Sequence, residues 1–181
     1  MNNEKHINNR SSLIVIMGVS GTGKSHIASE LSASLGFHFV EADDFHTDES
    51  KKRMSDNIPI TDEVRQCWFE LIRHYLKKSA NKNIILAFSG LKHQHRQGLR
   101  SLLFNTQFIW LDGQEKIISE RLSSRKGHFV SAGFLSGQLK AMEPPQTNEN
   151  DIIKINIDNE IEEVVSECLQ SVFVKNRNLI Y

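Results

Sequence analysis

Residues 18–25 read Gly-Val-Ser-Gly-Thr-Gly-Lys-Ser, the complete G-x-x-x-x-G-K-[ST] pattern of a phosphate-binding loop. The apolar, β-branched run 13–17 before it is typical of a buried parallel strand, and the apolar spacing over 27–35 after it predicts a helix. Glycines in such a loop allow positive φ angles, so backbone N–H groups can surround phosphate oxygens at the helix N-terminus. The sequence therefore predicts that the chain binds a nucleoside triphosphate.

The side chains of this loop have separate expected roles. Lys24 is expected to reach the β- and γ-phosphates, and Ser25 to offer its hydroxyl to Mg²⁺. The nucleotide-binding residues predicted in the loop are Gly18, Ser20, Gly21, Thr22, Gly23, Lys24 and Ser25.

Bulk composition restricts the class of partner. The chain has 181 residues, enough for one domain, and its 22 Lys and Arg balance 22 Asp and Glu, which favours neither nucleic acid nor a membrane surface. No apolar run approaches the roughly 20 residues of a membrane span, and the first twelve residues lack a signal-peptide core. Cys67 and Cys168 fall in helical patterns, where reduced packing residues are expected. These features predict a cytoplasmic protein.

Short apolar runs alternate with helical stretches, which predicts βαβ units and a parallel sheet. The expected fold is a three-layer α/β P-loop kinase fold, a five-stranded parallel sheet flanked by helices with a short mobile lid. The expected strands are 13–17, 37–40, 84–88, 108–111 and 152–155. The expected organisation is a disordered arm over 1–12, one domain over 13–175 with its lid at about 125–145, and a tail over 176–181.

The positions of acidic residues favour a small-molecule kinase over other P-loop proteins. The Asn-Lys-x-Asp guanine reader of GTPases is absent, and the third expected strand ends at 88–90 without the acid typical of motor ATPases. Acids instead follow the second expected strand, as Glu41 and Asp43. Adjoining ends of parallel strands meet at one edge, which would place these carboxylates near Lys24 and Ser25.

Further blocks follow the phosphate loop in a fixed order. They are Glu41-x-Asp43-x-x-His46, Arg53-Met54, Pro59-Ile60-x-Asp62-x-x-Arg65-x-x-Trp68, Ser89-Gly90-Leu91-Lys92-x-x-x-Arg96-x-x-x-Arg100, Arg121-Leu122-x-x-Arg125-Lys126-Gly127-His128-Phe129, and Gln138-Leu139-x-x-Met142-Glu143-Pro144. With these blocks the chain resembles the gluconate kinases, relatives of shikimate and adenylate kinases. The resemblance covers about residues 13–158.

The resemblance implies ATP-dependent phosphorylation of D-gluconate to 6-phospho-D-gluconate, with ATP and Mg²⁺ bound. Asp43 would accept or orient the hydroxyl proton, and Glu41, which stands where the family has Asp, would act on Mg²⁺ through water. Arg121 and Arg125, one helical turn apart, would stabilise the charge of the transferring phosphoryl group and bind the nucleotide. The implied catalytic residues are Lys24, Asp43, Arg121 and Arg125. The implied substrate-binding residues are Asp43, His46, Arg53, Arg65, Lys92, Arg96 and His128.

Departures from the family pattern leave alternatives open on the acceptor side. Val64 replaces an acid, His95 a tyrosine and Gln97 an aspartate. The alternatives are a kinase for another small sugar acid or related acceptor, such as a nucleoside monophosphate, and a non-catalytic nucleotide-sensing protein. The resemblance also implies a homodimer.

Overall fold

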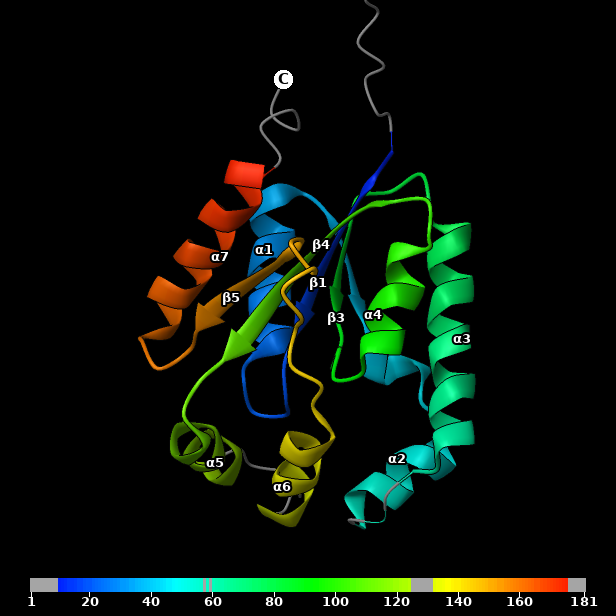
Figure 1. Cartoon of the computed structure of the whole chain (residues 1–181), viewed down its shortest axis with the longest axis vertical. Coiled ribbons are helices and arrows are strands. Elements are labelled where there is room, and N and C mark those ends of the chain that lie inside the picture. The colour runs from blue at the N-terminus through cyan, green and yellow to red at the C-terminus, as the bar shows by residue number, and fades with distance from the viewer. Residues whose placement is uncertain (1–9, 57, 59, 125–131, 176–181) are drawn as a thin grey trace, which may run out of the picture.

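The computed structural model describes residues 10–56, 58, 60–124 and 132–175. A five-stranded parallel sheet lies between two layers of helices, as the sequence predicts (Figure 1). The strands are β1 (Ser12–Met17), β2 (His38–Glu41), β3 (Ile84–Ala87), β4 (Asn105–Asp112) and β5 (Ile152–Asn156). The helices are α1 (Lys24–Leu35), the 3-10 helix η1 (Ala42–Phe45), α2 (Asp48–Ser55), α3 (Asp62–Lys78), α4 (His93–Arg100), α5 (Glu115–Ser124), α6 (Ala132–Ala141) and α7 (Ile161–Lys175).

The strand order is β2-β3-β1-β4-β5, so β3 lies between the strand that precedes the phosphate loop and the strand that ends in the acids. In the register, Ala87 of β3 pairs with Ile16 of β1 on one side and with Glu41 of β2 on the other. The carboxyl ends of β1 and β2 therefore reach the same edge without being adjacent. Figure 1 shows α2, α5 and α6 beyond this edge of the sheet.

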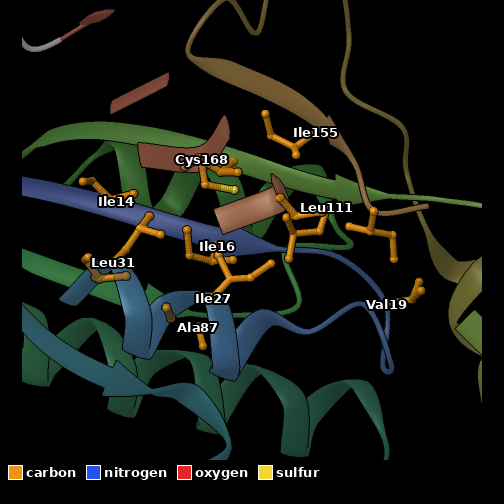
Figure 2. Packing of buried hydrophobic residues seen from close by; sticks show 14 of the residues in the cluster. Ile14, Ile16, Val19, Ile27, Leu31, Ala87, Leu111, Ile155 and Cys168 are labelled. Carbon is orange, nitrogen blue, oxygen red and sulfur yellow. The ribbon is translucent and has the colours of Figure 1, made fainter. Parts of the chain in front are cut away.

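Alternation along β1 divides the core into two halves. Ile14 and Ile16 belong to a cluster on the α1 and α7 side, which includes Cys168 (Figure 2). Leu13 and Val15 point to the opposite face, where the α3 and α4 layer covers the sheet. Every residue of β1 is buried, as a parallel strand covered on both faces requires.

Trp68 is buried in the core, and its indole N–H donates to Ala42 O at 2.8 Å. Cys67 is exposed, so its expected packing role is wrong, whereas Cys168 is buried. The strand β1 begins at Ser12, the last residue of the expected arm. Residues 1–9, 125–131 of the expected lid and 176–181 of the expected tail lie outside the described residues.

No helix in the part of the chain that the structure describes is long and apolar enough to cross a membrane.

Candidate active site

The phosphate loop joins β1 to α1 at the carboxyl edge of the sheet. Gly21 has a φ of +87°, and a Cβ there would lie 2.6 Å from Leu122 Cγ of α5, so only glycine allows this close packing. Gly23 is the N-cap of α1 with a φ of +90°, and Lys24 and Ser25 open that helix. The loop thus has the form expected for an anion site at a helix N-terminus.

Hydrogen bonds hold the loop around one carbonyl group. Lys24 Nζ donates to Val19 O at 3.0 Å, and the Thr22 hydroxyl donates to the same oxygen at 2.9 Å. Ser20 N donates to the Gln138 side-chain oxygen of α6 at 2.6 Å. The lysine ammonium therefore lies along the loop rather than in solvent.

Glu41 lies next to the beginning of α1. Burial raises the pKa of the half-buried Glu41 carboxyl above its ordinary value, and a hydrogen bond with the Ser25 side chain opposes this rise. The charges of Asp43 and Lys24 also act on it. The structure thus brings together Lys24, Ser25, Glu41 and Asp43, as the sequence predicts, although β3 separates the two strands.

A hydroxyl and a carboxylate are ligand types that suit Mg²⁺, so Ser25 and Glu41 fit the metal site expected of them. Among the described residues, no group of three or more His, Cys, Asp and Glu side chains could hold a metal ion.

The residues expected to bind the acceptor come from the η1, α3 and α4 region. His46 is buried and stacks on Trp68 with ring centroids 4.6 Å apart, and its Nδ1 has no hydrogen-bond partner. Burial lowers the pKa of His46 below its ordinary value, and Asp43 and Arg65 are close enough for their charges to act on it. The Arg65 side chain is 29% exposed, and its Nε is buried without a hydrogen-bond partner, 3.9 Å from Asp62 Oδ1.

His95 lies on the inner face of α4. Its ring is buried against Phe69 at 4.6 Å between centroids, and burial, with the charges of Arg65 and Lys92, lowers the pKa of His95 to about 4. The structure thus gathers Arg65 and Lys92 around a neutral imidazole. The other two departures from the family pattern, Val64 and Gln97, are exposed.

Arg96 has a different environment from the one expected. It is completely buried, and its Nε and Nη2 donate to the two carboxylate oxygens of Glu149 at 2.9 and 2.8 Å. Its Nη1 donates to Gly90 O and Glu143 O. All three guanidinium nitrogens of Arg96 therefore donate to protein acceptors, and the side chain holds the segment after α6 against α4. We therefore do not assign Arg96 to acceptor binding.

The remaining predicted residues have varied positions. Arg121 Nη2 donates to Ile157 O at 2.8 Å, which places its guanidinium beside the loop after β5. Arg53 is half-buried on α2, beyond the carboxyl edge of the sheet (Figure 1). Arg125 and His128 lie outside the described residues.

The sequence analysis assigned no role to three residues that make contacts around the site, which are Gln138, Glu143 and Glu149. Gln138 and Glu143 stand in a block that resembles the family, but that block carries no chemical signature of its own. Glu143 contacts Lys92 Nζ at 3.1 Å and accepts from His93 N at 2.7 Å. Glu149 stands in a polar stretch, and no local pattern indicates that it is buried between Arg96 and Arg100.

The sheet order, the phosphate loop and the carboxylates beside it define a P-loop kinase domain. A protein-family profile described as an AAA domain matches residues 13–145. The thermosensitive gluconokinase of Escherichia coli K12 is 37% identical over 168 residues, which cover 92% of this chain and 90% of that protein. The gluconokinase of Gluconobacter oxydans is 33% identical over 87% of this chain and 89% of that protein. The chain belongs to the gluconokinase family.

Comparison of structures agrees with this assignment. The crystal structure of a gluconokinase from Sinorhizobium meliloti 1021 superposes with a TM-score of 0.83 at 32% identity, covering 93% of this chain and 95% of that chain. The similarity extends over nearly the whole chain.

Proposed function

We propose that the protein transfers the γ-phosphoryl group of ATP to D-gluconate and forms 6-phospho-D-gluconate. The observation that carries this proposal is the arrangement of Asp43, Arg65 and Lys92 beside a complete phosphate loop, in a chain of the gluconokinase family. A hydroxyl nucleophile needs an oxygen base near the loop, and an aldonate carboxylate needs cations further away. This site offers both.

Phosphoryl transfer is mainly a matter of positioning and charge stabilisation. The N–H groups and Lys24 of the loop bind the phosphates, and Arg121 and Arg125 are assigned to the charge that develops on the transferred group. Asp43 is exposed on η1 and is assigned to orient the attacking hydroxyl and receive its proton.

The cations Arg65 and Lys92 are assigned to the gluconate carboxylate, because a guanidinium can bind a carboxylate through two parallel hydrogen bonds. His46 is assigned to a sugar hydroxyl, since its buried Nδ1 has no partner in the described structure. The assignment of Arg53 and His128 to acceptor binding stays a prediction.

Ser25 directly and Glu41 through water would hold Mg²⁺, which would supply positive charge to the triphosphate. The hydrogen bond between Ser25 and Glu41 supports a shared site for these two side chains. The cytoplasmic location and the homodimer stay predictions.

The test is ADP release from Mg²⁺-ATP with gluconate, other aldonates, shikimate, glucose or AMP as acceptor. We expect release that depends on gluconate. Activity with a different acid alone would reassign the acceptor, and nucleotide binding without any acceptor-dependent release would favour the nucleotide-sensing alternative.

A further inference from the structure

Gln138 contacts the phosphate loop although it lies 118 positions later in the chain than Ser20. Its carboxamide oxygen accepts from Ser20 N at 2.6 Å, and the contact is half-buried. In Figure 1, α6, which carries Gln138, lies beyond the carboxyl edge of the sheet, on the side where the loop between β1 and α1 turns. This contact joins α6 to the loop through a backbone donor.

The peptide unit between Val19 and Ser20 is the link from Gln138 to Lys24. In a trans peptide the C=O and N–H bonds point in opposite directions, and the described chain contains no cis peptide. The Val19 carbonyl receives Lys24 Nζ and the Thr22 hydroxyl, so the Ser20 N–H points the other way, to Gln138. One peptide plane is therefore held from both sides.

The direction of this plane is set by ψ of Val19 and φ of Ser20, and the hydrogen bonds of its C=O and N–H groups hold it in one orientation. Donation by the N–H group also polarises the carbonyl and makes it a better acceptor for an ammonium. The contact with Gln138 thus affects both the direction and the strength of the group that holds Lys24.

The segment after α6 is fixed independently of this contact. Glu143 N donates to Leu91 O at 2.8 Å, and the Glu143 carboxylate binds Lys92 and the N–H of His93. These bonds attach the end of α6 to the start of α4, on the acceptor side. Gln138 therefore reaches the phosphate loop from a support anchored beside an acceptor-binding lysine.

We propose that Gln138 is a positioning residue for phosphoryl transfer, which orients the Val19–Ser20 peptide and through it the Lys24 ammonium. The role rests on the proposed function, because it concerns the lysine assigned to the phosphates. It makes Gln138 a link between the acceptor side and the nucleotide side of the site.

The test compares Gln138→Met with Gln138→Glu in the full chain. Methionine matches glutamine in length but has no strong acceptor, so we expect kcat to fall about tenfold and Mg²⁺-ATP affinity to fall about threefold. Glutamate keeps an acceptor for Ser20 N–H, so its kcat should return to within about threefold of the natural protein. Its negative charge should raise KM for ATP instead.

Lys140→Met is the matched control, since Lys140 is an exposed residue of the same helix. It should change none of these constants, and the thermal midpoints of the Gln138→Met and Lys140→Met proteins should agree within a few degrees. Hydrogen exchange of the Ser20 amide, followed by NMR, should accelerate about tenfold in Gln138→Met alone. An unchanged kcat in Gln138→Met, or a Gln138→Glu protein as slow as Gln138→Met, would overturn the proposal.

Tighter ATP binding by Gln138→Met would also overturn it, because Gln138 would then compete with a phosphate for the N–H group. If the natural protein releases no ADP with gluconate, the proposed function fails. Ser20 exchange and Mg²⁺-ATP affinity still decide the role of Gln138 in that case, since neither needs an acceptor.

Discussion

The nucleotide side and the acceptor side of this site are built from different kinds of groups. The phosphate loop presents consecutive backbone N–H groups at the start of α1, and its local sequence is enough to locate it. The proposed acceptor side would use side chains from η1, α3 and α4, which only the tertiary structure brings together. A site made of backbone can therefore be located from a short motif, whereas a site made of side chains depends on which of them the fold uses for itself.

The largest effect should come from Lys24→Ala, on the nucleotide side. Removal of an ammonium that neutralises the phosphates should lower kcat by about a thousandfold. The measurement is gluconate-dependent ADP release, with Lys140→Ala as the control for loss of a lysine. Substantial turnover by Lys24→Ala would show that phosphoryl transfer does not depend on the lysine of the loop. The nucleotide side would then be no more sensitive to substitution than the acceptor side.

The next effect concerns stability and the side chains that the acceptor side uses for folding. Glu149→Gln removes the charge between Arg96 and Arg100, and an uncompensated buried arginine should lower the free energy of unfolding by about 3 kcal/mol. The hydrogen bonds from Arg96, more than any other contact, hold the pKa of Glu149 well below its ordinary value. Its stabilisation is therefore complete above that ordinary value and is lost as the pH falls toward the lower, folded-state value.

Urea unfolding between pH 7 and pH 3 measures this effect. The natural protein should lose stability with acid more steeply than Glu149→Gln, and Glu120→Gln, an exposed change, should follow the natural protein. A variant that keeps its stability but loses affinity for gluconate would contradict the structural role of Arg96 and return that arginine to the acceptor site.

Arg96 shows why the sequence located one side of the site better than the other. The pattern Lys92-x-x-x-Arg96 places two cations on successive turns of a helix, and periodicity cannot say which of them faces a buried carboxylate. That carboxylate, Glu149, is 53 residues away, so no local sequence pattern indicates that it pairs with Arg96. By contrast, the five strands and the phosphate loop followed from hydrophobic spacing and glycine positions, which are local properties. The helix α6 was not predicted, because it lies in the stretch 125–145 that was expected as a lid.

A smaller effect on turnover is expected from Asp43→Asn. An amide can still bind the acceptor hydroxyl but cannot receive its proton, so kcat should fall about a hundredfold while ATP affinity stays unchanged. Asp44→Asn is a close control, since Asp44 is the next residue of η1 and is also exposed. Equal losses in the two variants, or nearly normal turnover in Asp43→Asn, would remove Asp43 from the chemistry and leave the acceptor side with binding groups alone.

The smallest effect should come from His95→Tyr, which restores the residue of the family pattern. The pKa of about 4 keeps His95 neutral near pH 7, and a tyrosine is neutral there too, so the exchange changes no charge beside Arg65 and Lys92. The larger ring must fit against Phe69, which should lower the free energy of unfolding by about 1 kcal/mol.

Because the charges are the same, KM for gluconate should change less than about threefold. The control Gln97→Asp adds a charge at an exposed position and should also change KM less than about threefold. With a pKa of about 4, His95 stays neutral between pH 6 and pH 8 and should contribute no change in the KM of the natural protein across that range. Steady-state kinetics at several pH values in this range tests this. A tenfold change in KM, or a switch of preference to another aldonate in His95→Tyr, would show that this buried ring selects the acceptor. Selection would then rest on shape inside the core rather than on the exposed residues that also depart from the pattern.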